Sequence, residues 1–260
     1  MYKTKFETKP SIMKKKFLIS LFVLIGALFI FSCEEENITP DGGTSQIGDK
    51  NVIMPLGASR VEGAESFLSY RYELWKLMVD GQWEFDFIGS MEDELPFADY
   101  NGQSFDRDHE GHGGFTSGQI LAQIEAWLDQ AGTPDIVLFS SPGGNDALEN
   151  LSYDAAIENI NAIIDIIQAK NSEVTILIEQ LAPAQSELMV GNLASFFAQM
   201  SEDIVSIAAS QSTSTSNVIV VDMATGFTDS FLADDVHYNE EGAKFIAERY
   251  YNILENILEN

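Results

Sequence analysis

The stretch Ile136-Val137-Leu138-Phe139 and the segments that follow it decide the fold. Four consecutive apolar residues are typical of a strand that is buried on both faces of a parallel sheet. Isoleucines then recur at helical spacing through 153–170, and 174–178 is again mostly apolar. A strand, a helix and a second strand in this order predict a βαβ unit, from which parallel sheets with covering helices are built.

The same alternation continues on both sides of this unit. Further short apolar runs predict strands, at 52–56, 85–88 and 218–221. Patterned segments predict helices, at 65–79, 117–130, 193–210 and 240–257, the last of them capped by Asn239. Five strands interleaved with helices predict an α/β fold, a three-layer α/β/α sandwich with a five-stranded parallel sheet. The polar segment 90–114 has no period, and we expect a functional connection there, because structureless segments of this length are unusual in compact domains.

The composition excludes several classes of function. The chain has 260 residues, with 41 Asp and Glu against 14 Lys and Arg, and a net charge of −27. Such a surface repels the phosphates of nucleic acids and anionic lipid headgroups, so we expect no nucleic-acid partner. One cysteine and three histidines argue against a disulfide framework and a cysteine-rich zinc site, and we expect neither a metal nor an organic cofactor.

The N-terminus has the pattern of an export signal. The basic run Met13-Lys14-Lys15-Lys16 precedes an apolar segment, 17–31, that is shorter than the ~20 residues a spanning helix needs. The sequence Ile30-Phe31-Ser32-Cys33 resembles the lipobox of bacterial lipoproteins, in which the cysteine carries lipid and becomes the first mature residue. The alternative is an ordinary signal peptide followed by an unrelated cysteine.

These signals predict three parts of the chain. We expect a lipoprotein signal peptide at 1–32, an acidic, glycine-containing tether at 33–50 and one folded domain at 51–260. Glu34-Glu35-Glu36 resembles the acidic tag that sends some lipoproteins of the Bacteroidetes to the cell surface, and a solvated linker is the alternative. The expected location is the cell envelope, at the periplasmic or the outer face of the outer membrane, with membrane contact only through the lipid.

Polar residues of chemical interest gather where the predicted strands end. Ligands of parallel sheets bind beyond the carboxyl ends of the strands. Four blocks lie at such positions or just before the last helix, at 57–63, 111–116, 143–146 and 234–237. A serine on a glycine turn, Ser59, suits a nucleophile, and a glycine turn before a helix leaves N–H groups free for an anion. Asn145 can donate to an oxyanion, and His237 with Asp234 three residues earlier can form a base with its orienting partner.

In this order, the four blocks resemble those of the SGNH hydrolases, also called GDSL esterases and lipases, across residues 51–258. The resemblance implies a flavodoxin-like fold and a serine esterase. It implies that Ser59 is the nucleophile, that His237 is the general base and that Asp234 orients the imidazole. No cofactor is part of this pattern.

The resemblance also implies an oxyanion hole. Its donors would be the backbone N–H of Ser59, the backbone N–H of Gly114 and the side-chain amide of Asn145, with Gly113 as the alternative to Gly114. The sequence departs from the family pattern at Ala58, where an aspartate is usual, and this departure bears on the geometry of the loop more than on the chemistry.

A narrower resemblance is to the third acetyl-esterase family among the carbohydrate esterases. Residues 53–57 and 109–115 resemble its first two blocks, which implies removal of acetyl groups from xylan or related polysaccharides. Two other functions stay open: a lysophospholipase or thioesterase of the same fold, and a non-catalytic, carbohydrate-binding surface lipoprotein.

Three further residues are candidate substrate contacts, namely Arg60, His112 and Asp146. Arg60 could bind an anionic group or pair with a surface acid. His109 and His112 could compete for the role of base, or hold a metal together with Glu110. The tryptophans at positions 75, 83 and 127 are expected to be in the core or partly buried rather than on a sugar-stacking platform.

Overall fold

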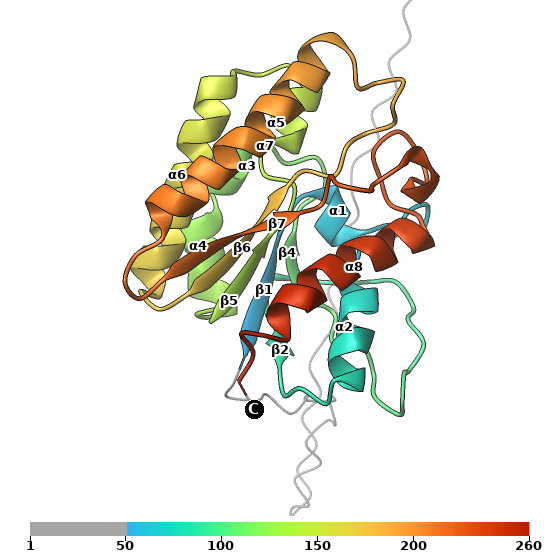
Figure 1. The fold of residues 1–260 in the computed structure, drawn as a ribbon. Helices are drawn as coiled ribbons and strands as arrows, with labels where there is room; N and C mark the ends of the chain where they lie inside the picture. Colours follow the sequence, from blue (N-terminus) through green and yellow to red (C-terminus); the bar gives the residue numbers. More distant parts are fainter. Residues whose placement is uncertain (1–50, 260) are drawn as a thin grey trace, which may run out of the picture. The chain divides into compact units, whose positions relative to one another are not determined.

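A computed structural model describes residues 51–259 and shows an α/β fold around a mostly parallel sheet (Figure 1). The sheet runs in the order β3-β4-β1-β5-β6-β7, with β2 also paired to β1. Among the strands of residues 51–259, β3 and β4 form the only antiparallel pair. The strands are β1 (Val52–Gly57), β2 (Asp86–Phe87), β3 (Met91–Glu92), β4 (Asp108–Gly111), β5 (Ile136–Phe139), β6 (Thr175–Gln180) and β7 (Asn217–Asp222).

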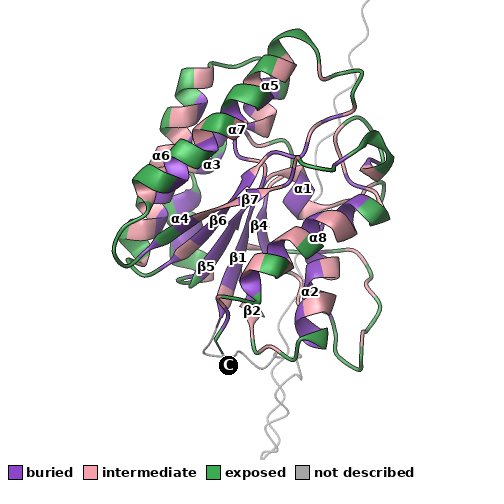
Figure 2. Ribbon diagram, viewed as in Figure 1, coloured by how far each residue is buried: buried purple, intermediate pink, exposed green. Residues whose placement is uncertain are grey.

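Helices cover both faces of the sheet, which gives the predicted three layers. One face is covered by α3 (Ser117–Leu121), α4 (Ile124–Ala131), α6 (Tyr153–Lys170) and α7 (Gly191–Gln211). The other face is covered by α2 (Arg71–Asp80) and α8 (Glu240–Leu254). The central strands are accordingly buried along their length, as Figure 2 shows. The four residues of β5 are all buried, which confirms that this strand lies inside the sheet.

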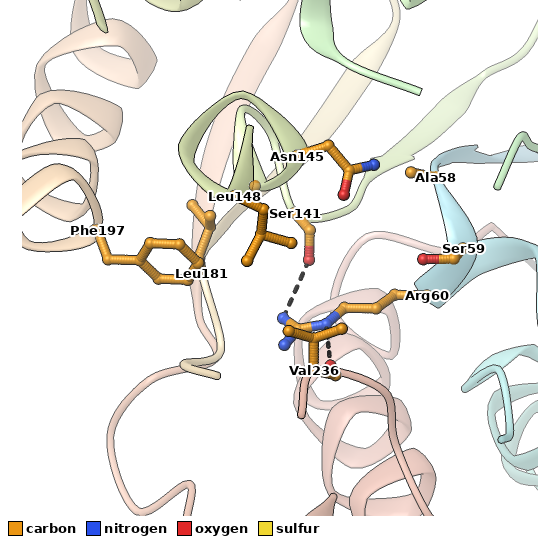
Figure 3. Close-up of a pocket in the computed structure, with 10 residues that line it drawn as sticks. Ala58, Ser59, Arg60, Ser141, Asn145, Leu148, Leu181, Phe197 and Val236 are labelled. Atoms are coloured by element: carbon orange, nitrogen blue, oxygen red, sulfur yellow. Dashed lines mark hydrogen bonds between the residues drawn. The ribbon is translucent and has the colours of Figure 1, made fainter. Parts of the chain in front are cut away.

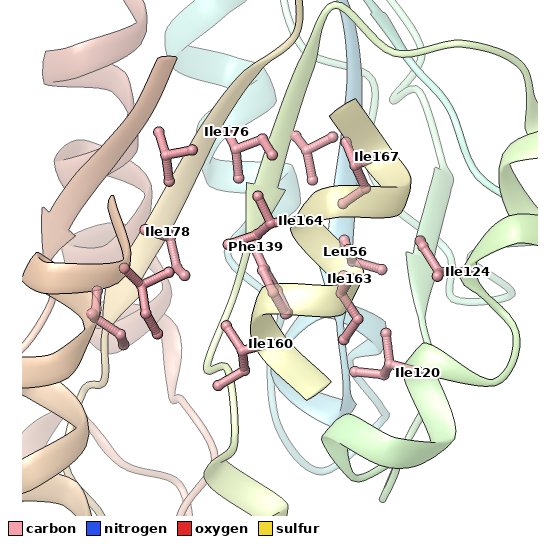
Figure 4. Close-up of a cluster of buried hydrophobic side chains, with 14 of the residues drawn as sticks. Leu56, Ile120, Ile124, Phe139, Ile160, Ile163, Ile164, Ile167, Ile176 and Ile178 are labelled. Atoms are coloured by element: carbon pink, nitrogen blue, oxygen red, sulfur yellow. The ribbon is translucent and has the colours of Figure 1, made fainter. Parts of the chain in front are cut away.

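Helix α6 has the bounds that the isoleucine pattern predicts. The side chain of Ser152 caps its N-terminus by accepting a hydrogen bond from the N–H of Ala155. Ile160, Ile163, Ile164 and Ile167 of this helix are fully buried and belong to the same apolar cluster as Phe139, Ile176 and Ile178 (Figure 4). Each such side chain contributes about 1.5–3 kcal/mol through its removal from water.

The five-stranded prediction is short by two strands, β3 and β4, which both lie in the segment expected to be a connection. β4 reads Asp-His-Glu-Gly, and an apolar pattern cannot find such a strand. His109 and Glu110 are nevertheless buried, because polar partners satisfy them. The Glu110 carboxylate accepts hydrogen bonds from the N–H and the hydroxyl of Ser90, each at 2.7 Å.

Two predicted helices differ in the structure. The helix expected from residue 65 begins at Arg71, because Leu68 forms a bridge with Tyr238 and keeps the preceding segment extended. The helix expected at 117–130 is two helices, α3 and α4, separated at Ala122 and Gln123. The predicted cap of α8 is confirmed, since the Asn239 side chain accepts a hydrogen bond from the N–H of Gly242.

Three short helices follow strand ends or precede α8, namely α1 (Ser59–Glu62), α5 (Gly144–Leu148) and the 3-10 helix η1 (Asp229–Phe231). Within residues 51–259 no helix is both long enough and apolar enough to cross a bilayer. The predicted signal peptide, the tether and Cys33 lie outside the described residues.

Candidate active site

The first, third and fourth sequence blocks converge at the carboxyl end of the sheet. Gly57 ends β1, and Ser59 opens α1 after a single intervening residue, Ala58. The backbone must come very close here, since a Cβ on Gly57 would lie 2.9 Å from the carbonyl oxygen of Ser140, just after β5. Only glycine tolerates this approach, and it brings the Ser59 turn beside the turn that carries Asn145.

Ser59, His237 and Asp234 form a continuous chain of hydrogen bonds. The Asp234 carboxylate accepts from Nδ1 of His237, with Oδ2 at 2.8 Å. A neutral imidazole that donates through Nδ1 has its lone pair on Nε2. That nitrogen lies 2.8 Å from the hydroxyl oxygen of Ser59 and can accept its proton. The two residues are 178 positions apart in the chain, so the fold alone brings them together.

The loop around His237 holds the imidazole in place. Phe67 stacks on the ring, with centroids 3.7 Å apart and planes inclined by 11°. Oδ1 of Asp234 also accepts the backbone N–H groups of Val236 and His237. Partial burial opposes ionisation of Asp234, but these hydrogen bonds and that from the His237 side chain outweigh it and lower the pKa of the carboxyl below its ordinary value. Asp234 is therefore an anion over the whole neutral range.

Donors for an oxyanion lie beside the Ser59 hydroxyl. The first N–H groups of a helix have no acceptor within the helix, and Ser59 is the first residue of α1. The Asn145 side chain faces the same cavity as Ser59 (Figure 3). Its Nδ2 donates one hydrogen to the carbonyl of Phe115 at 2.8 Å, which orients the amide and leaves its second hydrogen available.

Gly114 precedes Phe115, so the hydrogen bond of Asn145 brings this loop to the edge of the site. Gly114 has a φ of 78°, a conformation that favours glycine. It is not among the residues that line the cavity around Ser59. The assignment of its N–H as the second oxyanion donor therefore stays a prediction.

The cavity beside Ser59 is small and largely apolar. Its volume is about 30 Å³. Its apolar wall consists of Leu148, Leu181, Phe197 and Val236, and its polar edge includes Ser59, Ser141 and Asn145. Figure 3 shows these side chains around the space between Ser59 and Phe197.

Two of the three candidate substrate contacts, Arg60 and Asp146, use their polar groups inside the protein, although Arg60 also lines the cavity beside Ser59. Arg60 is buried, and it donates to the carbonyls of Val236, Ala182 and Pro183. Its donors are thus used inside the protein rather than offered to an anion. Asp146 is only 3% exposed, because its carboxylate accepts the N–H and the hydroxyl of Ser117 at the start of α3.

His112, the third candidate contact, forms a separate pair. Its Nε2 lies 2.5 Å from Oε1 of Glu110, and its ring stacks on Trp127 with centroids 4.1 Å apart. Burial, with Arg71 and His112 nearby, lowers the pKa of His109 to about 2, so that imidazole stays neutral. Within residues 51–259 no group of three or more His, Cys, Asp or Glu side chains is placed to hold a metal ion.

Sequence reasoning missed the side chains that support the site. Glu179, at the end of β6, is fully buried beneath the site, and its sequence position alone does not show this. Phe67, which stacks on His237, was assigned to a helix. Leu148 and Phe197 had no signal at all, since they lie on helices whose register toward the cavity only the tertiary structure sets. Trp75 and Trp127 are buried and Trp83 is half-buried, as predicted.

Comparison with known proteins agrees with this architecture. The model of the GDSL-like lipase/acylhydrolase family matches residues 89–245, more than half of the chain. The match includes Asn145, Asp234 and His237, and it begins after the Ser59 block. No curated protein matches the chain.

Solved structures resemble nearly the whole folded part. A crystal structure of a carbohydrate esterase family 3 protein from Talaromyces cellulolyticus has 28% identity and a TM-score of 0.70, covering 79% of this chain and 97% of that one. An acetyl esterase mutant with acetate ion gives the same values. A Clostridium thermocellum family 3 carbohydrate esterase has 29% identity and a TM-score of 0.65, covering 79% and 96%. With the family match, they show that this chain belongs to the GDSL-like lipase/acylhydrolase family and is a carboxylic ester hydrolase.

Proposed function

We propose that the protein removes small O-acyl groups, acetyl in particular, from polysaccharides by a Ser59-His237-Asp234 mechanism. The observation that carries this proposal is the hydrogen-bond chain from Asp234 to Ser59, which ends at a small apolar cavity. These hydrogen bonds link a nucleophile, Ser59, to its base, His237, and the cavity can hold a short acyl group.

The chemistry follows from the tautomer that Asp234 imposes. Nε2 of His237 takes the hydroxyl proton as Ser59 attacks the ester carbonyl. The tetrahedral intermediate collapses, the C–O bond to the alcohol breaks, and the imidazolium returns the proton to the leaving oxygen. Water then repeats the sequence on the acyl-enzyme, which releases the acid and restores Ser59. Asp234 stabilises the imidazolium in both halves of the reaction.

Negative charge on the carbonyl oxygen requires donors that are already in place. The N–H of Ser59 and the amide of Asn145 lie on the polar edge of the cavity. The N–H of Gly114 is the proposed third donor. Loss of one such donor costs about 2.7–4 kcal/mol of transition-state stabilisation in enzymes of this type.

The cavity favours a small acyl group over a fatty acyl chain. A volume of about 30 Å³ leaves room for a methyl group, and Leu181 and Phe197 close it from behind. A lysophospholipase or a long-chain thioesterase would need a deeper apolar channel. The sugar part of the proposal is supported by the names of the similar proteins, two of which are family 3 carbohydrate esterases.

Two assays test the proposal in sequence. Hydrolysis of p-nitrophenyl esters with two to twelve acyl carbons measures acyl preference, and we expect the acetate ester to give the highest kcat/KM. Acetate release from a panel of acetylated polysaccharides, beginning with acetylated xylan, then tests which alcohol component of the ester the enzyme accepts. A preference for long acyl chains would reject the acetyl assignment, and hydrolysis of p-nitrophenyl acetate without acetate release from any polysaccharide would reject the polysaccharide assignment.

Phe197→Ala is expected to shift acyl preference toward longer chains. Removal of the ring deepens the cavity, so the ratio of kcat/KM for butyrate over acetate should rise about tenfold, as one or two additional buried methylenes are worth about 1–3 kcal/mol. Phe196→Ala is the matched control, since this neighbouring side chain packs against Tyr153 and does not line the cavity. An unchanged ratio in Phe197→Ala would show that the acyl group binds elsewhere.

The lipid anchor predicted at Cys33 places the enzyme in the cell envelope. Mass spectrometry of the membrane fraction of the native host should find a diacylated N-terminal Cys33, and Cys33→Ala should release the protein from that fraction. The physical reason is that two acyl chains give stable membrane attachment, whereas so acidic a protein surface does not bind a membrane by itself. A membrane-bound protein with an unmodified Cys33 would contradict the prediction.

A further inference from the structure

Arg60 lies at the meeting point of the three loops of the site. It follows Ser59 directly, its Nε donates to the carbonyl of Val236 at 2.9 Å, and its Nη1 lies 3.3 Å from the hydroxyl of Ser141. Val236 precedes His237, and Ser141 begins the turn that carries Asn145. Figure 3 shows both contacts. The Arg60 guanidinium thus joins segments that adjoin Ser59, Asn145 and His237.

The remaining donors of Arg60 add a fourth segment. Nη1 and Nη2 donate to the carbonyls of Ala182 and Pro183, at 2.8 and 3.2 Å, in the loop after β6. The guanidinium also lies over the Tyr238 ring, 4.8 Å from its centroid. The guanidinium donates to loop carbonyls and not to a carboxylate. This side chain therefore sets the positions of backbone segments.

Glu179 holds the other side of Ser141. Its carboxylate is fully buried and accepts the N–H of Ser141 at 2.7 Å and the hydroxyl of Tyr250 at 2.7 Å. The Ser141 hydroxyl also lies 3.3 Å from this carboxylate, so it can accept from Arg60 and donate to Glu179. Ser141 has a φ of 46°, a conformation rare outside glycine, so the turn needs this support to keep its shape.

We propose that Arg60 and Glu179, linked through Ser141, form a buried positioning network that keeps the nucleophile turn, the Asn145 turn and the His237 loop in register. Arg60 and Ser141 also line the cavity beside Ser59, but the network acts by holding other residues in place. The His237 loop needs such support because Asp234 is half exposed, with 47% of its side chain accessible. The proposal rests on the function proposed above, and part of its test is independent of that function.

Arg60→Met tests the network, because methionine fills a similar space and has no donors. We expect kcat for p-nitrophenyl acetate to fall about 100-fold with KM changed less than threefold, since displacement of catalytic groups by about 1 Å costs this much. Arg60→Lys keeps the positive charge but lacks the planar guanidinium with its several N–H donors. We expect its kcat to be about tenfold higher than that of Arg60→Met. Glu179→Gln keeps the shape and removes the charge, and we expect a kcat loss of about tenfold.

Arg249→Met is the matched control. Arg249 also donates to loop carbonyls, those of Asp222 and Thr225, but neither residue adjoins Ser59, Asn145 or His237. We expect its kcat to stay within twofold of the unsubstituted protein. Thermal unfolding of every variant shows whether a loss of activity is a loss of folded protein, and a variant that does not fold is replaced by Arg60→Lys.

A second measurement needs neither substrate nor turnover. The proton between His237 Nδ1 and Asp234 should give a downfield proton NMR resonance, and Arg60→Met should shift or broaden it while Arg249→Met leaves it unchanged. A folded Arg60→Met protein with unchanged kcat and an unchanged resonance would overturn the proposal. A raised KM with unchanged kcat would overturn it in favour of substrate binding. Absence of ester hydrolysis in the unsubstituted protein, with the resonance still sensitive to Arg60, would reject the proposed function alone.

Discussion

Ser59→Ala is expected to abolish ester hydrolysis while the protein stays folded. The substitution removes the attacking oxygen, and loss of the nucleophile in other serine hydrolases lowers kcat by about 10⁶-fold. The hydroxyl's hydrogen bond to His237 is at a partly buried position, so its loss should change stability by no more than about 1 kcal/mol. The measurement is the turnover of p-nitrophenyl acetate by purified protein, together with a thermal unfolding curve.

Ser186→Ala is the matched control, because this serine is exposed and bonds Asp229 away from the cavity. We expect its activity to equal that of the unsubstituted protein. Hydrolysis by Ser59→Ala at an undiminished rate would exclude Ser59 as the nucleophile. The cavity and its donors would then need another attacking group, such as a bound water.

His237→Ala is expected to lose several orders of magnitude in kcat, as removal of a triad base does. His112→Ala and His109→Ala are the matched controls, since the structure pairs His112 with Glu110 and buries His109 among backbone groups. We expect both to retain kcat within about tenfold and to lose stability instead. An inactive His112→Ala protein beside an active His237→Ala protein would reverse the assignment of the base.

The acid side of the pH profile should report one group. Hydrogen bonds lower the pKa of Asp234 below its ordinary value, so this carboxylate is already ionised where an imidazole titrates. As pH falls through the neutral range, kcat/KM should therefore decrease with a slope of no more than one, because Asp234 gains no proton there. A slope of two would mean that a second group, such as Asp234, gains a proton in the same range. Asp234→Asn tests the orienting role and should lower kcat by about 10⁴-fold.

Several elements were predictable because their signals are local. The apolar run of β5 and the isoleucine spacing of α6 indicate burial from neighbouring residues alone. The structure contains both elements as predicted. The cap at Asn239 is likewise a contact between neighbours in the chain. Strand β4 was missed because its burial depends on a distant partner, Ser90, and not on the hydrophobicity of its own residues.

The order of the blocks at strand ends also predicted that Ser59, Asn145 and His237 would meet, because parallel strands end at one edge of a sheet. The sequence alone thus determined the fold class and the residue types that gather at the carboxyl end of the sheet. Only the tertiary structure decided what each polar side chain does there. Arg60 and Asp146 are both candidate substrate contacts in the sequence, yet they form hydrogen bonds with segments 176 and 29 residues away. Such partners become neighbours only when the chain is folded, since no periodic pattern encodes a contact between distant loops.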